Sequence, residues 1–565
     1  MKKVSKILAL VLVAAIVLSL VACGGKTETS KMGGTLTVFG NIGSAEGYSV
    51  LDERILEGFK EKTGVTVEIQ TASSSGYLEQ LQLMIASGEY PDAALFPTTT
   101  VQAYIDVCEA GKAVPLDEYL TEENAPNLMA YTYPTAWEGV KPLEDGKIYA
   151  IPRTSLVRNE GIILRADWTR NVGMGEILER TLNEVSAEEF TELAKRFTLD
   201  DPDNNGKNDT IATACWTDDT TKQFGPYEFA RGFYGDYGWY AYEGEDYEYM
   251  FPMYSQKSDI YKKQLQYTQD MFKAGYLDPD GPTLTKTAVD DNFAQQRYGF
   301  NPGFVGGLPG NEQKIIDANG GLNCQDGPYV DYIFAKDENG LVAGNGYYKP
   351  MWGQWCVFDV CEDPNAFVQL CDYILSDEIW NLVSNGEEGT TYEVIDGYRV
   401  SIEVGPNEQK RGASFPAGIV RKAGDRDYFV KVKTLDAKRA HMEQITNHSF
   451  YIGQATQIDS LDNGFVPSVA SETRFINAQD DLAQTVTKIC ANQMAVSEYD
   501  KALEKWYAAG GKEYVEQMNN YITENQKLES SPKPEIPLKP SEWNDAYTYQ
   551  KTYYEEGPDA AEALK

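Results

Sequence analysis

Histidine is nearly missing from this chain of 565 residues, which contains only His441 and His448. A histidine-rich metal site or a histidine relay for a nucleophile therefore has little to draw on. The patterns GxxxxGK[ST], HExxH and GxSxG are also missing, so the sequence offers no phosphate loop, zinc-protease motif or nucleophile elbow. The sequence therefore lacks the motifs and histidines that most nucleophilic and metal-dependent catalytic mechanisms require.

Positive charge is scarce as well. Lys and Arg together number 50 against 86 Asp and Glu, and the formal net charge is −36. Such a balance argues against a nucleic acid or an anionic membrane surface as the partner. It suits a soluble domain outside an anionic cell envelope, with a neutral ligand such as a sugar fitting better than a phosphate.

The chain has few cysteines, and their spacing matches neither a disulfide framework nor paired CxxC zinc ligands. One of the eight, Cys23, follows an apolar N-terminal run, and the other seven are an odd number. We interpret most of these seven as small buried hydrophobic residues. They are Cys108, Cys215, Cys324, Cys356, Cys361, Cys371 and Cys490.

The N-terminus has the pattern of a bacterial secretion signal. Lysines precede the apolar run 7–21, which is shorter than the roughly 20 residues that span a bilayer. Leu20-Val21-Ala22-Cys23 closes the run like a lipoprotein cleavage site, so we predict removal of 1–22, lipidation of Cys23 and a tether over 23–34. The alternative is an ordinary secretory signal in which Cys23 is incidental.

The remaining length exceeds what one hydrophobic core fills, so at least two lobes are expected. Short apolar strand patterns at 35–39, 65–69 and 92–96 alternate with helical patterns around 50–63 and 78–85. Alternation of this kind favours a parallel α/β sheet.

Several stretches resemble family 1 extracellular solute-binding proteins, the sugar-capturing lipoproteins of ATP-binding-cassette (ABC) importers. The opening of the family is matched by 59–67 and 83–92, and three further matches lie at 146–152, 164–168 and 386–394. The stretch 498–519 resembles the closing helices of the long, oligosaccharide-binding subgroup. The resemblance implies a two-lobed periplasmic-binding-protein-like fold of type II, with a ligand cleft between the lobes.

The family fold joins its lobes by segments that cross more than once, and we place these crossings near 151, 296 and 357. An N-terminal lobe would then hold 35–150 and 298–357, with Asn301-Pro302-Gly303 as a turn. A C-terminal lobe would hold 151–297 and 358–529. Residues 530–565, which begin with a Pro-rich stretch, read as a C-terminal extension on the surface.

The stretch 201–209 has the spacing of an EF-hand-type calcium loop. Oxygen-bearing side chains occupy loop positions 1, 3, 5 and 9, and Gly206 stands at position 6 for the sharp turn. Ala212 replaces the usual bidentate Glu at position 12, and an Asn/Asp-rich surface turn without metal is the alternative. Relatives in the resembled subgroup carry structural calcium in such a loop, which implies Ca²⁺ ligands at Asp201, Asp203, Asn205, Lys207 (through its carbonyl) and Asp209.

A sugar site needs aromatic rings for pyranose faces and polar groups for hydroxyls. The candidate rings, for each of which core packing is the alternative, are Trp216, Trp239, Phe300, Trp352 and Trp355, the last two carrying most weight. The candidate polar residues lie in loops after strands or in the matched stretches, where solvated side chains are the alternative. They are Asn41, Ser74, Arg153, Arg158 and Glu388.

We therefore predict a monomeric, lipid-anchored substrate-binding protein on the extracellular face of the cytoplasmic membrane, with no catalytic residues. It would trap an oligosaccharide by hinge closure and deliver it to ABC permease subunits. The rival hypothesis is a surface-anchored glycoside hydrolase, since two of the many carboxylates could form a catalytic pair. Peptide or metal import is also compatible with the binding class.

Overall fold

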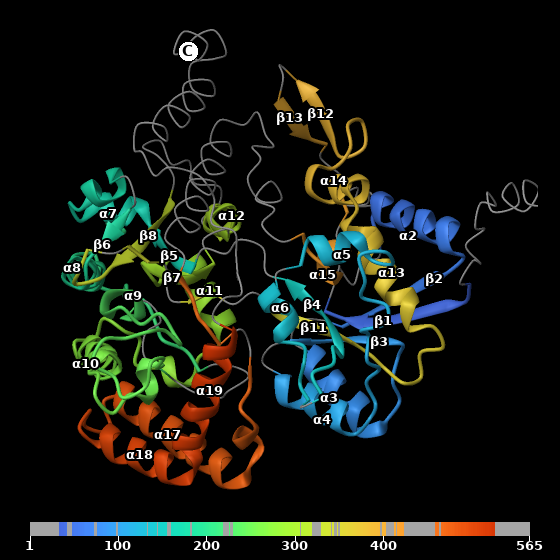
Figure 1. Ribbon diagram of the computed structural model, residues 1–565. Coiled ribbons are helices and arrows are strands. Elements are labelled where there is room, and N and C mark those ends of the chain that lie inside the picture. Colours follow the sequence, from blue (N-terminus) through green and yellow to red (C-terminus); the bar gives the residue numbers. More distant parts are fainter. Residues whose placement is uncertain are drawn as a thin grey trace, which may run out of the picture.

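The computed structural model forms two α/β lobes, which stand side by side in Figure 1. It describes residues 33–41, 48–72, 76–97, 100–132, 134–143, 145–154, 160–180, 183–217, 225, 230–304, 307–318, 329–340, 342–343, 347–348, 351–395, 398–402, 412–413, 415–422, 458–462 and 465–525. The predicted signal segment, tether and C-terminal extension lie outside the described residues.

The first lobe is built on a five-stranded sheet in the order β2-β1-β3-β11-β4. Its strands are β1 (Thr35–Gly40), β2 (Thr66–Thr71), β3 (Ala93–Pro97), β4 (Ala150–Thr154) and β11 (Met351–Val357). Strand β1 pairs in parallel with β2 and β3, which confirms the predicted parallel βαβ opening, while β11 is antiparallel to β3 and β4.

Helices cover both faces of this sheet (Figure 1). They are α2 (Val50–Thr63), α3 (Tyr77–Ser87), α4 (Val101–Glu109), α5 (Pro126–Ala130), α6 (Pro134–Glu138), α13 (Pro364–Leu375), α14 (Asp377–Asn385) and α15 (Pro416–Ile419). Helix α2 begins at Ser49, whose side chain and that of Asp52 form a reciprocal capping box, and it ends at Gly64 with a φ of 85°. The hairpin β12 (Tyr392–Ile395) and β13 (Tyr398–Ser401) projects beyond α14.

The second lobe is built on a sheet in the order β6-β8-β5-β7. Its strands are β5 (Glu160–Arg165), β6 (Glu184–Val185), β7 (Phe300–Phe304) and β8 (Val330–Lys336), with β9 (Val342–Ala343) pairing β8 and a separate pair of β10 (Tyr347–Tyr348) with β14 (Ile458–Asp459). Its helices are α7 (Ala166–Asn171), α8 (Ala187–Leu199), α9 (Ala230–Tyr234), α10 (Ile260–Lys273), α11 (Lys286–Ala294), α12 (Leu308–Ala318), α17 (Thr473–Cys490), α18 (Glu498–Trp506) and α19 (Lys512–Asn525). Short 3₁₀ turns are η2 (Gly175–Glu179), η3 (Pro252–Tyr254), η4 (Gly281–Thr283) and η6 (Ser468–Ser471), and a π-helical turn, η7 (Tyr507–Gly511), joins α18 to α19.

The expected lobe boundaries differ from the structure in two places. Strands β7 and β8, expected in the N-terminal lobe, both pair antiparallel with β5 of the second sheet, so the expected turn at Asn301-Pro302-Gly303 is part of a strand. Helices α13 to α15, expected in the C-terminal lobe, pack in the core of the first lobe. A buried strand looks the same in sequence whichever sheet it joins, because register and partner are tertiary properties.

Three connections link the lobes, and all leave the first sheet at the same end. They run from β4 to β5, from β10 to β11, and from the segment after α15 to β14. Only three residue steps separate Tyr348 from Met351, so β10 lies within about 11 Å of the start of β11. We call the end of each sheet at which these connections leave or enter it the hinge end, and we call the opposite end of the sheet the far end. In the second lobe, the register of β5 with β7 and β8 puts the ends of β7 and β8 at the hinge end.

Six of the seven cysteines after Cys23 fall within the described residues, and all six are buried and free. This confirms their interpretation as small hydrophobic residues, while Cys324 lies outside the described part. Among the helices that the structure describes, none combines the length and apolarity that crossing a bilayer requires.

Candidate functional site

Three of the candidate aromatic rings pack inside the lobes. Trp355 is fully buried, contacts Phe367, and donates from Nε1 to the carbonyl of Ile419 at 2.7 Å. Phe300 is fully buried against Phe190, with ring centroids 4.5 Å apart. Trp239 is 4% exposed and belongs to the core of the second lobe. These three rings therefore pack in the cores of the lobes, which was the alternative to a role in ligand binding.

Two other candidates lie at the hinge end of the first lobe, one lies beside its projecting hairpin, and the rest fall outside the described residues. Asn41 directly follows β1 and is exposed, and Arg153 is a buried residue of β4 whose Nη2 donates to the carbonyl of Ala417 at 3.3 Å. Glu388 is exposed beside the β12–β13 hairpin. Cys23, Ser74 and Arg158 lie outside the described part of the chain, as does the side chain of Trp352, whose backbone belongs to β11.

Trp216 is the candidate ring that the structure places beside polar groups. The Nζ of Lys286 lies 5.4 Å from its ring centroid, and the backbone of the next residue, Thr217, donates to Leu284 at 3.0 Å. The ring is half-buried, so it is held in place while part of its surface stays accessible. This arrangement ties the ring to the start of α11.

The same lysine anchors a polar network across β7, α11 and α12. Lys286 pairs with Asp290 and donates to Asn301 Oδ1 at 2.8 Å. Asn301 Nδ2 in turn donates to Asp290 Oδ1 at 2.9 Å and to Asn311 Oδ1 at 3.2 Å. We call Trp216, Lys286, Asp290, Asn301 and Asn311 the hinge-end network.

The position of this network follows from the strand register. Asn301 pairs with Ile163 near the middle of β5, and the Lys286 side chain lies nearer the hinge end, because a side-chain carbon placed on Gly303, which pairs with Gly161, would lie 3.9 Å from Lys286 Cε. In the view of Figure 1, α11 and α12 lie along the side of the second lobe that is turned toward the first. Sequence reasoning missed four of these five residues, because single Lys, Asp and Asn side chains carry no motif.

The predicted calcium ligands come together around one amide. Asn205 Nδ2 donates to Asp203 Oδ2 at 2.8 Å and to Asp209 Oδ1 at 3.0 Å, while Asp201 accepts from the backbones of Asn205 and Gly206. The pKa of Asp203 is raised by burial of its carboxyl and by the neighbouring carboxylates of Asp201 and Asp209. Within the described residues, no group of three or more His, Cys, Asp or Glu side chains is arranged to hold a metal ion.

The donor set nevertheless has the chemistry that a hard cation prefers. An amide nitrogen occupies the centre between two carboxylates, and rotation of the Asn205 side chain would replace it with the amide oxygen. Carboxylate, amide and backbone carbonyl oxygens are the ligands of Ca²⁺. The loop residues therefore fit calcium after a local rotation.

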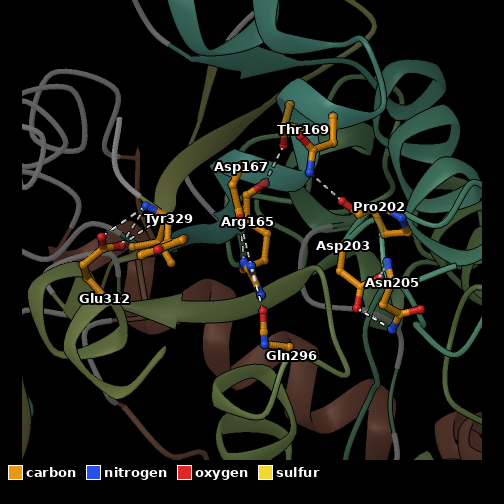
Figure 2. A network of polar contacts seen from close by, with 11 residues as sticks. Arg165, Asp167, Thr169, Pro202, Asp203, Asn205, Gln296, Glu312 and Tyr329 are labelled. Carbon is orange, nitrogen blue, oxygen red and sulfur yellow. Dashed lines mark hydrogen bonds and ion pairs between the residues drawn. The ribbon is translucent and has the colours of Figure 1, made fainter. Parts of the chain in front are cut away.

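Figure 2 shows how this loop is connected to the far end of the second sheet. Asn171, at the end of α7, donates to the carbonyl of Pro202 at 2.8 Å. Helix α7 follows β5, whose last residue, Arg165, is buried and forms two bonds to Asp167 at 2.8 and 2.5 Å. The Arg165 guanidinium also donates to Gln296 at 3.2 Å and lies 4.6 Å from the ring centroid of Trp168.

Comparison with known proteins agrees with the predicted resemblance. The family model described as bacterial extracellular solute-binding protein matches residues 42–319. These residues belong to that family. The match includes β2, β3 and β4 of the first sheet and β5, β6 and β7 of the second, and it agrees with the family predicted from the sequence stretches.

Two curated proteins of Bacillus subtilis (strain 168) are similar to this chain over most of their length. The polygalacturonan/rhamnogalacturonan-binding protein YtcQ is 22% identical over 483 residues, covering 82% of this chain and 87% of that protein. Lipoprotein LipO is 21% identical over 472 residues, covering 82% and 88%.

Solved structures share the two-lobed fold. The alginate-binding protein AlgQ2, solved without calcium ion, superposes with a TM-score of 0.60 at 16% identity, covering 88% of this chain and 99% of that one. The N-glycan transport solute-binding protein NgtS of Streptococcus pneumoniae gives a TM-score of 0.56 at 16% identity, covering 87% and 98%. The family and these neighbours are binding proteins, and the predicted type II fold is confirmed.

Proposed function

We propose that this protein is the substrate-binding component of an ABC importer and captures an oligosaccharide between its two lobes. The observation that supports the proposal is the hinge-end network, in which an aromatic ring, amides and a charged pair lie together beside α11, a helix on the side of the second lobe that is turned toward the first in Figure 1. Pyranose recognition needs this combination of a ring face and hydrogen-bonding groups. The relatives support it, since YtcQ, AlgQ2 and NgtS are each named for a glycan ligand.

Capture works by a shift between open and closed arrangements of the lobes. A ligand favours closure only if it binds the closed form better, so it has to contact both lobes. The hinge-end network supplies the contacts of the second lobe, and Asn41, Arg153 and Glu388 are the described candidates on the first. Trp352, Ser74 and Arg158 remain candidates there, and no catalytic group is required.

The family is extracellular, and the N-terminal sequence suggests how the protein is attached there. We propose that cleavage before Cys23 and lipidation of that residue hold a monomer on the outer face of the cytoplasmic membrane, next to its permease. The similarity to lipoprotein LipO supports this anchor. The predicted tether would leave both lobes free to close.

Calcium is proposed as a structural ion in the 201–209 loop. Asp201, Asp203, Asn205, Asp209 and the carbonyl of Lys207 would hold it, and it would neutralise the two carboxylates that face the Asn205 amide and the Asp201 carboxylate beside them. The loop connects through Asn171 to the far end of the sheet, so the ion would stiffen the second lobe without touching the sugar.

Isothermal titration calorimetry of the chain from Gly24 onward, with trigalacturonate, xylotetraose, kestose and Man5GlcNAc, tests this function. We expect one-to-one binding of at least one oligosaccharide with a micromolar or lower Kd. The same mixtures are then analysed for cleavage products, which separates binding from glycoside hydrolysis. Cleavage above background would contradict the binding-only function, and an absence of heat with all four sugars would contradict oligosaccharide capture.

A further inference from the structure

Three tyrosines of the second lobe form a compact aromatic cluster at the edge of its hydrophobic core, against which Tyr242 packs. The rings of Tyr237 and Tyr242 are nearly parallel, with centroids 6.5 Å apart and an interplanar angle of 7°. Tyr240 stands edge-on to both, at 5.9 and 6.1 Å, and is 38% exposed. We call these residues the tyrosine triad. Two fixed neighbours set the orientation of the Tyr240 ring, so an exposed aromatic surface is held ready before any ligand arrives.

Hydrogen bonds fix the triad to the end of β8. The hydroxyl of Tyr237 donates to Asp337 Oδ2 at 3.0 Å, and Asp337 is the residue that follows β8. The backbone of Tyr237 donates to the hydroxyl of Tyr242 at 2.7 Å, and that hydroxyl donates to the carbonyl of Gly238 at 3.2 Å. Because β8 ends at the hinge end of the sheet, the triad lies at that end too.

A second, independent contact places the triad beside another lobe crossing. The backbone of Trp239 donates to Ser460 Oγ at 3.0 Å, and Leu461 donates to the carbonyl of Trp239 at 2.9 Å. Ser460 follows β14, which pairs with β10. Since β10 lies within about 11 Å of the start of β11 in the first lobe, the residue next to Trp239, Tyr240, is close to the hinge.

The electrostatic surroundings of the triad are net negative. Burial raises the pKa of the Tyr237 hydroxyl, and the adjacent Asp337 raises it further. Burial also raises the pKa of Tyr242, with Asp236 raising it and Arg231 lowering it. Both hydroxyls therefore stay neutral, and a ligand carboxylate near them would meet two carboxylates and one guanidinium.

We infer that the tyrosine triad is a subsite for a neutral pyranose unit, stacked on Tyr240 at the hinge-side end of the bound oligosaccharide. This inference rests on the proposed function and deepens it. The ring of Tyr240 takes the C–H face of the sugar, and the neighbouring carboxylates favour hydroxyl groups over a uronate. The subsite thus gives the second lobe two aromatic contacts, Trp216 beside α11 and Tyr240 near the end of β8.

Affinity measurements on Tyr240 variants test the subsite. Xylotetraose, Man5GlcNAc and trigalacturonate are titrated into wild type, Tyr240→Ala, Tyr240→Phe and the control Leu83→Ala. Leu83 is 61% exposed on α3 of the first lobe, so the control removes exposed apolar surface elsewhere. We expect about a tenfold weaker Kd for neutral sugars in Tyr240→Ala, and values within about twofold of wild type in Tyr240→Phe and Leu83→Ala.

Nitration of wild-type protein by tetranitromethane, read by peptide mass spectrometry, gives a readout that no variant's folding can disturb. Saturating neutral oligosaccharide should protect Tyr240. If wild type binds a neutral sugar but Tyr240→Ala binds it within twofold and Tyr240 is not protected, the subsite is overturned while the proposed function stands. If wild type binds none of the three sugars, the subsite is overturned, and the proposed function fails as well only if kestose also gives no heat. Tighter binding of trigalacturonate than of either neutral sugar, lost in Tyr240→Ala, would overturn the assignment to a neutral unit.

Discussion

The two ends of the second lobe's sheet are both polar, but their polar groups are arranged differently. At the far end, Arg165 is buried and its bonds are made to Asp167 and Gln296 within the protein (Figure 2). At the hinge end, Trp216, Lys286 and Tyr240 keep part of their side chains accessible. Buried groups that satisfy one another stabilise a fold, whereas accessible rings and amides in fixed positions can bind a ligand. Changes at the far end should therefore alter stability, and changes at the hinge end should alter affinity.

Arg165→Met should give the largest loss of folding stability among these changes. It leaves Asp167, whose side chain is only 21% exposed, without its ion-pair partner, and we expect a loss of about 3 kcal/mol in the unfolding free energy of the second lobe. Urea denaturation followed by circular dichroism measures the loss, with Lys195→Met on the exposed face of α8 as the control. An unchanged midpoint would show that the far-end ion pair does not support the fold.

Calcium should stabilise the far end to a similar extent. At a free concentration one hundred times its Kd, a bound ion adds about 2.7 kcal/mol to the folded state. Thermal unfolding with calcium or with EGTA measures the gain, which Asp203→Asn should abolish while Asp480→Asn on α17 retains it. Equal melting temperatures with and without calcium in the wild type would rule out a structural ion.

Asp331→Asn should change the pH dependence of stability. Burial raises the pKa of Asp331 to about 7, so the folded state binds a proton that the unfolded state has lost above its ordinary value of 3.8. Stability contributed by this group therefore falls as pH rises from about 4 to about 7. The amide can still accept from Asn183, so the variant should melt at least about 2 °C above wild type at pH 8 and no higher at pH 4. Melting curves that run parallel across this pH range would contradict the assignment.

Trp216→Ala should act on ligand binding and not on the stability of the fold. Removing the ring beneath Lys286 should weaken oligosaccharide binding about tenfold, which equals about 1.4 kcal/mol. Calorimetry measures the affinity, and Trp380→Phe in the first-lobe core serves as a control for loss of aromatic volume away from the site. Unchanged affinity in Trp216→Ala would remove the hinge-end network from the binding site.

Local sequence patterns predicted the parts of the fold that depend on residues close together in the chain. The strands at 35–39, 65–69 and 92–96, the helix around 50–63 and the parallel pairing were all visible in the sequence as periodicity and alternation. The sequence did not show that β7 and β8 belong to the second sheet, because tertiary packing decides which strands pair. Trp355 and Phe300 read as possible ligand rings for the same reason, since a ring's sequence position does not show whether it faces a core or solvent.

Hydrogen exchange measured by mass spectrometry, with and without the oligosaccharide that binds most tightly, tests most directly whether the ligand is captured between the hinge ends of the two lobes. We expect added protection in peptides from the hinge ends of both lobes, around 150–154, 237–242 and 286–301, and little change at 165–171 or 201–209. Protection confined to the far end of the second lobe, or to one lobe alone, would contradict capture between the hinge ends.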